Sequence, residues 1–184
     1  MKISYPLLAA VLLLSSCTTT FRNVRIFELN GNDPKALVTI HEDFCSSLGY
    51  LDSKGRLHVI RAQLDALGEL GQILFSPSQQ KVVVESYGEG HQYLSIYVIR
   101  DLIQERCGGT EFIRAYRTLD PYPYGFRDIR WLTDDCIQFS AKADMTQFDR
   151  ELRRGKAALD DGIDLPHLWK WHLETDTFER IGSQ

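Results

Sequence analysis

Runs of β-branched and aromatic residues, many of them alternating with polar ones, dominate this chain after residue 23. The clearest runs are 81–87 (KVVVESY) and 93–100 (YLSIYVIR), separated by the Gly-rich turn 88–92. Apolar residues also alternate in 136–142 and in 169–173. Successive side chains of a strand point to opposite faces, so a period of two indicates half-buried strands, and glycines permit a tight hairpin between them. The sequence therefore predicts a mostly β protein of antiparallel strands.

An aromatic strand end, a polar turn and a new apolar strand occur twice in this order. The two copies are residues 75–82 (FSPSQQKV) and 131–137 (WLTDDCI), 56 residues apart. Residues 94–99 reappear in the same way as residues 168–173, but 74 residues later. The difference between the two spacings fits one insertion at 143–166. We therefore expect two repeated units, because a fixed internal period indicates a repeat architecture.

Each repeated unit is expected to contain four antiparallel strands, here called strands a to d in chain order. The first unit covers about residues 70–119 and the second about 126–184. Strand d is expected near 111–116 in the first unit and near 178–181 in the second. Residues 24–70 are expected to form a third, poorer sheet.

The inserted segment is predicted to form a short, exposed helix from about Thr146 to Arg154. Thr146 and Asp149 form a Thr-x-x-Asp helix start. Asp149 and Arg153 are a favourable i,i+4 pair, and Gly155 follows them.

The four-stranded unit resembles the blades of β-propellers, and residues 75–81 are similar to the turn between strands a and b of periplasmic Tol-type propeller repeats. This chain departs from the family in that turn, where the expected Asp-Gly is Ser78-Gln79 and, in the second copy, Asp134-Asp135. The resemblance implies antiparallel four-stranded meanders. Since a closed propeller has at least four blades, three sheets would form an incomplete propeller, or the two copies would pack as a sandwich.

The first apolar run, residues 3–14, is too short to span a membrane. Its 12 residues would cover about 18 Å as a helix, against roughly 30 Å of hydrocarbon. Lys2 precedes the run and the small residues Ser15 and Ser16 follow it, as in a secretory signal. We therefore expect a cleaved signal peptide.

Leu14-Ser15-Ser16-Cys17 resembles the lipobox of bacterial lipoproteins. The resemblance implies that Cys17 carries the lipid, that residues 1–16 are removed and that the protein is anchored on the periplasmic side of the envelope. Residues 17–23 would then be a tether and 24–184 a single β-rich domain. Thr18 stands where many lipoproteins retained in the inner membrane have Asp, which favours the outer membrane.

Charge and cysteine content narrow the possible partners. The formal net charge is −4, and losing Lys2 with the signal would make it −5. Without a long basic run, nucleic acid and anionic lipid are poor partners. Besides Cys17 there are three cysteines, so at most one internal disulfide can form, for which Cys107 and Cys136 are the candidates; small buried thiols are the alternative.

The turns between strands b and c, and the links from one unit to the next, should lie on one edge of the sheets, because antiparallel strands reverse direction at each turn. Tyrosine and phenylalanine offer large contact areas at low entropic cost, so this rim is the candidate binding surface. Alternatively, the Pro-Tyr-Pro-Tyr segment caps the core. The candidate residues are Tyr87, His91, Tyr93, Tyr122, Tyr124 and Phe126, beside the inserted segment 143–166.

Catalytic motifs, cofactor motifs and a recognised metal-site spacing are absent from the sequence. His41 and Asp43 point away from Glu42 on a strand, and the odd spacing of His167 and His172 places them on opposite faces. Trp169 and Trp171 share a face, as expected for core residues.

We therefore predict a non-enzymatic, lipid-anchored envelope protein that binds another envelope protein or acts as a scaffold. One alternative is a small hydrolase or carbohydrate-binding protein that uses Asp160, Asp161 and Asp164. The other is a structural subunit that completes a propeller by self-association.

Overall fold

The computed structural model describes residues 23–30, 34–41, 46–60, 69–88, 91–104, 115–120, 125–152, 154–156 and 166–182. Several predicted residues lie outside these ranges. They are Cys17, Cys45, Cys107, Tyr122, Tyr124, Asp160, Asp161 and Asp164.

The described chain forms three antiparallel four-stranded sheets, each a meander in which neighbouring strands pair in sequence. Sheet 1 contains β1 (Asn23–Glu28), β2 (Ala36–His41), β3 (Ser46–Leu51) and β4 (Leu57–Ile60). Sheet 2 contains β5 (Glu69–Phe75), β6 (Lys81–Gly88), β7 (His91–Val98) and β8 (Arg117–Leu119). Sheet 3 contains β9 (Phe126–Thr133), β10 (Cys136–Ala141), β13 (His167–His172) and β14 (Thr177–Ile181). The predicted fold class is thereby confirmed.

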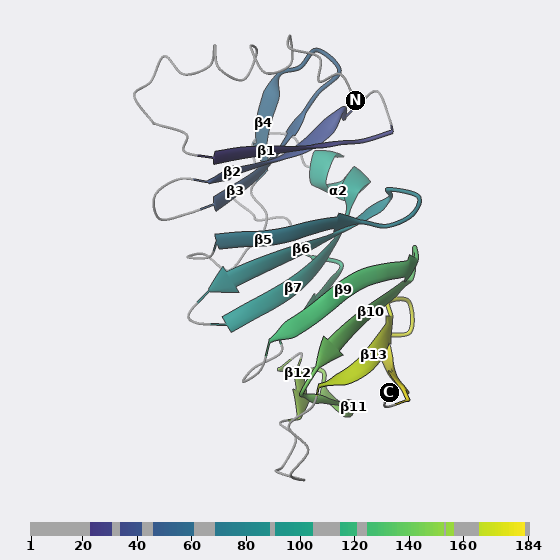
Figure 1. The fold of residues 1–184 in the computed structure, drawn as a ribbon. Helices are drawn as coiled ribbons and strands as arrows, with labels where there is room; N and C mark the ends of the chain where they lie inside the picture. Colours follow the sequence, from purple (N-terminus) through teal and green to yellow (C-terminus); the bar gives the residue numbers. More distant parts are fainter. Residues whose placement is uncertain are drawn as a thin grey trace.

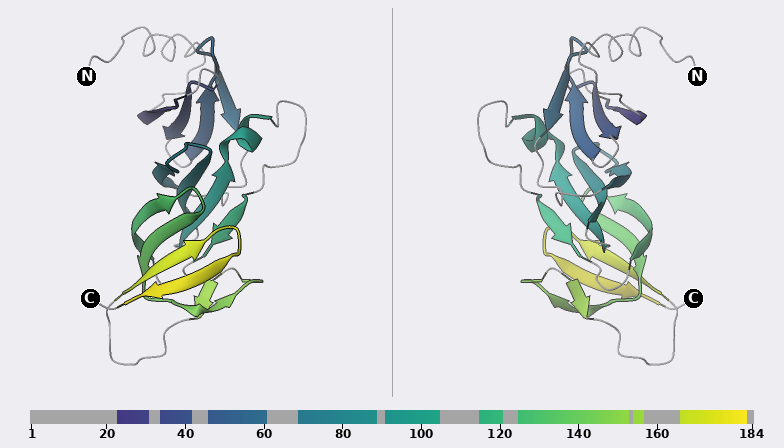
Figure 2. Two further views of the ribbon diagram at one scale, coloured as in Figure 1. Left: turned by 90° about the vertical axis from the view of Figure 1, so that its right-hand side faces the viewer. Right: turned by 90° about the vertical axis from the view of Figure 1, so that its left-hand side faces the viewer.

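The three sheets are stacked in chain order, and their first strands β1, β5 and β9 lie on the same side of the stack (Figures 1 and 2). The three sheets form an open stack, and the described strands form no closed barrel. The region 24–70, predicted to form a poorer sheet, contains the complete four-stranded sheet 1 over residues 23–60. No described helix is long and apolar enough to cross a membrane.

Both faces of sheet 2 are buried, because the alternating side chains of its strands pack on different neighbours. One face packs against sheet 3, and the other against sheet 1 and the helix α2 (Ile99–Gln104). The cluster between sheets 2 and 3 includes Val83, Leu94, Ile96, Phe139, Trp169 and Trp171. Core packing of the two tryptophans, which are 1% and 0% exposed, is confirmed.

Hydrogen bonds join the turn between strands a and b of sheet 2 to the corresponding turn of sheet 3. Ser78 of sheet 2 donates to the Asp134 carboxylate of sheet 3 from its backbone nitrogen (2.9 Å) and its hydroxyl (2.8 Å). The Trp131 indole donates to the carbonyl of Leu74 over 2.9 Å. Gln79 has a φ of 57°, so it adopts the left-handed conformation for which the missing glycine of the turn would be suited. We call this edge the ab rim.

The predicted helix in the insertion is wrong. Residues 144–156 contain a hairpin of β11 (Asp144–Asp149) and β12 (Arg154–Lys156). Met145 is buried and Phe148 packs on Phe178 with ring centroids 4.7 Å apart. This contact with sheet 3 outweighs the local helix signal, because burial of large apolar side chains outweighs local propensity.

Two further boundaries differ from the prediction. Strand d of sheet 2 is β8 (Arg117–Leu119), later than the predicted 111–116. Strand c ends at Val98, and residues 99 and 100 begin helix α2, which was not predicted. Ile99 and Leu102 of that helix are buried against sheets 1 and 2, so the helix is held by packing.

Candidate functional site

The predicted rim exists as an edge of the stack, and we call it the bc rim. It contains the ends of β6 and β8 and the starts of β7 and β9, together with the ends of β2 and β10. The structure does not bring all its candidate residues together, however. Tyr87 pairs with Gln92 and Tyr93 pairs with Ser86, so the two tyrosines lie on opposite faces of sheet 2.

Tyr87 is the exposed aromatic residue among the described candidates, with 44% of its surface accessible. Phe126, in contrast, is 4% exposed and packs edge-on against Phe139 with ring centroids 5.0 Å apart. The prediction that Phe126 belongs to a binding surface is therefore wrong, because its ring fills the core between sheets 2 and 3. His91 lies in β7, opposite Gly88.

A buried carboxylate, that of Glu85, lies directly behind Tyr87. Glu85 is 3% exposed and faces sheet 3. Its carboxylate accepts hydrogen bonds from the Tyr87 hydroxyl (2.5 Å), from the backbone nitrogen of Gln72 (2.8 Å) and from the Gln92 side-chain amide. A buried charge is tolerated when hydrogen bonds replace its hydration, and these three donors come from β5, β6 and β7.

Gln92 extends this network to sheet 3. Its amide nitrogen donates to the carbonyl of Phe126 over 3.3 Å, and its side-chain oxygen accepts from the backbone nitrogen of the same residue. Gln92 thus pairs with the first residue of β9 as a strand neighbour would. The polar cluster of Glu85, Tyr87 and Gln92 consequently links sheet 2 to the start of sheet 3 at the bc rim.

Two glycines leave room for this polar cluster. A β-carbon on Gly71 would lie 2.5 Å from the Glu85 carboxylate, and one on Gly125 would lie 2.9 Å from the side-chain oxygen of Gln92. Gly71 and Gln72 together face Glu85 in a bulge of β5, since Leu70 pairs with Ser86 and Ile73 with Val84. The bulge therefore brings a backbone donor to Glu85.

The electrostatics keep Tyr87 as a hydrogen-bond donor. Burial, followed by the hydrogen bond to Glu85, raises the pKa of Tyr87 to about 12. The phenol is therefore protonated at neutral pH and cannot act as a base there. What the cluster provides is an exposed aromatic ring in a fixed position.

A second polar group at the bc rim lies in sheet 1. His41 Nδ1 and the Ser46 hydroxyl are hydrogen-bonded over 2.8 Å. Burial, and then Arg25, lower the pKa of His41, so the imidazole is neutral at pH 7. His41 Nε2 and Thr39 Oγ1 are buried and find no hydrogen-bond partner among the described residues.

The remaining predictions have simple outcomes. Cys136 is a buried free thiol, and burial raises its pKa. Its candidate partner Cys107 lies outside the described residues, so their pairing stays a prediction. The burial of Cys136 fits the alternative of a small buried side chain.

His167 and His172 lie on opposite faces of β13, as predicted, where they pair with Ala141 and Cys136 respectively. Within the described ranges, no group of three or more His, Cys, Asp or Glu side chains could hold a metal.

Sequence reasoning missed Glu85 and Gln92. The sequence did contain a signal for Glu85, because this charged residue follows three valines in the predicted strand 81–87 and shares a face with Val83. Charged residues are seldom fully buried unless hydrogen-bonded or paired. Gln92 was assigned to a turn, whereas it belongs to β7.

Comparisons with known proteins support the fold. No family model and no curated protein matches this chain. Among solved structures, it is similar to the uncharacterized protein lmo1340 from Listeria monocytogenes EGD-e, with a TM-score of 0.56 and 11% sequence identity. The match covers 87% of this chain and 40% of that chain, so the present chain spans less than half of its length.

Proposed function

We propose that this chain is a lipid-anchored envelope protein that acts as a non-enzymatic binding or scaffold module, with Tyr87 as a contact residue at the bc rim. The lipobox-like segment ending at Cys17 supports the anchor. One observation carries the binding role: the exposed Tyr87 ring is held by a hydrogen bond to buried Glu85. An aromatic ring that is already ordered loses little entropy when a partner covers it.

A photo-crosslinking amino acid at Tyr87, in cells that make the full-length chain, tests this role. Leu132 is a matched control position, because it is also a large exposed side chain, at 38%, and lies near the ab rim. We expect Tyr87 to form one dominant crosslink to another envelope protein and Leu132 to form none to it. Equal crosslinking from both positions, or only lipid and intramolecular products, would contradict the proposal.

Self-association is the second candidate function, because the three sheets form an open stack. Association would cover the outer edges of the first strands, each of which pairs with a described strand on one side, and the end sheets. The mass of the purified full-length chain in non-ionic detergent distinguishes the two candidates. A monomer supports the binding module, whereas a stable oligomer that persists on dilution supports the self-associating subunit.

A further inference from the structure

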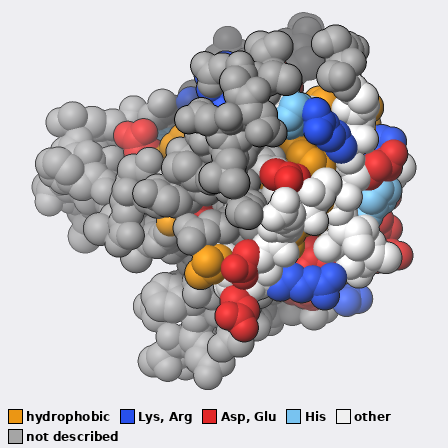
Figure 3. Space-filling view, turned by 90° about the horizontal axis from the view of Figure 1, so that it is seen from below, with side chains coloured by type: hydrophobic (Ala, Val, Ile, Leu, Met, Phe, Trp, Pro, Cys, Tyr) orange, Lys and Arg blue, Asp and Glu red, His pale blue; other side chains and the backbone are white. Residues whose placement is uncertain are grey.

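The outer face of sheet 3, which is turned away from sheet 2, ends the stack. A cross-strand row runs through its middle and consists of Arg130, Gln138, Lys170 and Glu179. At the same positions, sheet 2 has the row Leu74, Val83, Ile96 and Arg117, whose first three members pack against sheet 3. Seen from below, the described surface at this end shows mixed charged side chains and few hydrophobic ones (Figure 3). A polar face of this kind cannot bury another apolar sheet.

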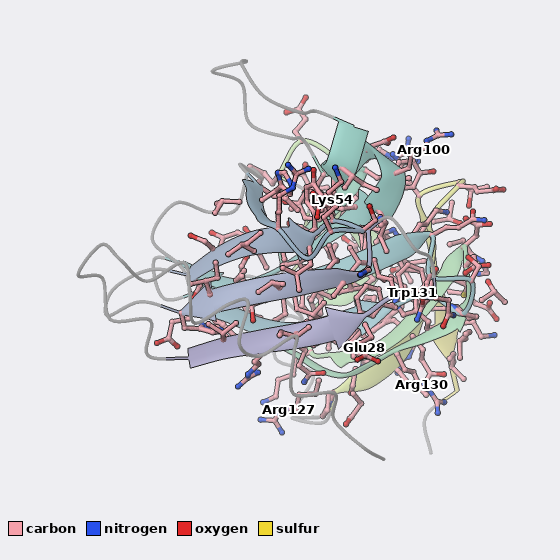
Figure 4. All side chains as sticks on the ribbon, turned by 90° about the horizontal axis from the view of Figure 1, so that it is seen from above. Glu28, Lys54, Arg100, Arg127, Arg130 and Trp131 are labelled. Carbon is pink, nitrogen blue, oxygen red and sulfur yellow. The ribbon has the colours of Figure 1, made fainter. Side chains whose placement is uncertain are left out.

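A bulge in β9 adds a second arginine to this face. Arg127 pairs with Ser140 and Arg130 pairs with Gln138, so Asp128 and Ile129 together face Phe139. In a regular strand, residues three positions apart point to opposite faces; the extra residue puts both arginines on the outer face. Asp128 has a φ of 53°, which is unfavourable for a residue with a side chain. Both arginines are exposed and extend away from the molecule (Figure 4).

The charges on this face are not balanced. Glu179 lies 3.4 Å from Lys170 Nζ and 3.5 Å from His172 Nε2, so the carboxylate of the middle row is already shared. Arg130 donates to the Gln138 side-chain oxygen over 3.1 Å. Among the described residues, neither Arg127 nor Arg130 has an ion-pair partner. Two exposed guanidinium groups are therefore left without a carboxylate from the described part of the chain.

We propose that the outer face of sheet 3 binds an acidic segment of a partner protein, whose carboxylates pair with Arg127 and Arg130. This inference rests on the proposed binding function and adds the chemistry of the partner. Planar guanidinium groups match carboxylates in two-pronged hydrogen bonds. A second copy is a poorer occupant than an acidic segment, because each chain carries a net charge of −4 and two copies repel each other at long range.

Binding of a fluorescent octaglutamate peptide to the full-length chain in non-ionic detergent tests the proposal. We expect salt-sensitive binding that R127E/R130E weakens by about tenfold, the effect of two exposed ion pairs turned repulsive. The control R100E/R150E reverses two other exposed arginines and should change affinity less than about twofold. Thermal unfolding of both variants verifies that they fold. Absent peptide binding, or equal losses in both variants, would overturn the proposal.

Two further readouts identify the occupant. Vesicles of phosphatidylglycerol that bind in place of the peptide, and lose binding in R127E/R130E, would show that lipid occupies the face and would also overturn the proposal. A photo-crosslinker at Thr177, at one corner of the outer face, should join an acidic segment of a protein in cells. If Tyr87 crosslinks persist while Thr177 gives none, this inference fails and the proposed function stands.

Discussion

At the level of single residues, Glu85 is the side chain on which the geometry of the bc rim depends. Its carboxylate accepts hydrogen bonds from three donors on three strands. One of these donors is the hydroxyl of Tyr87, the residue whose ring is exposed. We expect Glu85→Gln to lower the free energy of unfolding by about 1–3 kcal/mol, because the amide nitrogen would face at least one of these donors. Urea unfolding measures the change. Glu174→Gln, at an exposed site, is the control and should have almost no effect.

Loss of stability in Glu174→Gln equal to that in Glu85→Gln would contradict this assignment. Glu85→Gln should also bring the pKa of Tyr87 closer to its ordinary value, because the hydrogen bond to the carboxylate contributes to raising it. Ultraviolet titration of the tyrosines detects that shift.

Two tyrosines with raised pKa values should lower the stability of the protein at high pH. Burial raises the pKa of Tyr97 to about 12, and burial with the Glu85 hydrogen bond raises that of Tyr87 to about 12. The unfolded chain releases these protons near pH 10, so the contribution of the two tyrosines to the free energy of unfolding should be constant below about pH 9 and be lost as pH rises from about 10 to 12. The larger part belongs to Tyr97, which is 1% exposed, since solvent screens Tyr87.

Urea unfolding between pH 8 and 12 tests this dependence, and Tyr97→Phe should remove most of the slope. A stability that does not change up to pH 12 would mean that neither phenol is perturbed in the folded protein.

At the level of elements, the bulges in β5 and β9 decide which groups these first strands present to their surroundings. The β5 bulge presents the Gln72 nitrogen to Glu85, and the β9 bulge turns Arg127 outward. Gly71→Ala should destabilise the protein by about 1–3 kcal/mol, because the new methyl group would lie 2.5 Å from the Glu85 carboxylate. Gly182→Ala is the matched control, since a β-carbon there meets nothing within 4 Å.

Urea unfolding of Gly71→Ala and Gly182→Ala provides the comparison. Equal stabilities of the two variants would show that the space beside Glu85 is not needed.

Strands with a regular alternation of apolar residues were predictable from the sequence, as in β6, β7, β10 and β13. The hairpin of β11 and β12 was not, because its local chemistry is that of a helix start. The Asp149 carboxylate accepts from the backbone nitrogens of Glu151 and Leu152, both at 2.9 Å, as a helix-capping residue would. What decides in favour of strands is the packing of Phe148 on Phe178, a contact between segments distant in sequence.

The candidate site was predictable only in part. Strand direction correctly placed the bc turns and the links between units on one rim. It could not show that Phe126 enters the core, or that Tyr87 and Tyr93 face different neighbours, because both depend on how the sheets stack. The polar cluster around Glu85 depends on a bulge, which a regular alternation does not reveal.

At the level of the whole molecule, three four-stranded sheets form an open stack with different ends (Figure 2). Sheet 3 ends the stack with a polar face, while the outer face of sheet 1 contains the apolar cluster of Ala36, Val38, Ile40 and Leu51, which is already buried within the chain at 0–3% exposure. Closing a ring between two copies would pair the polar face of sheet 3 with an end whose apolar residues are already covered, so little apolar surface would be buried. The asymmetry therefore favours a monomeric module over a self-completing propeller.

Mass spectrometry of the amino-terminal peptide, from the protein isolated from membranes of its native cell, tests the central claim most directly. We predict that the mature chain begins at Cys17 and that this residue carries a diacylglyceryl group. Cys17→Ser should abolish the modification and release the protein from the membrane fraction. A mature chain that begins elsewhere, or whose Cys17 is unmodified, would contradict the account.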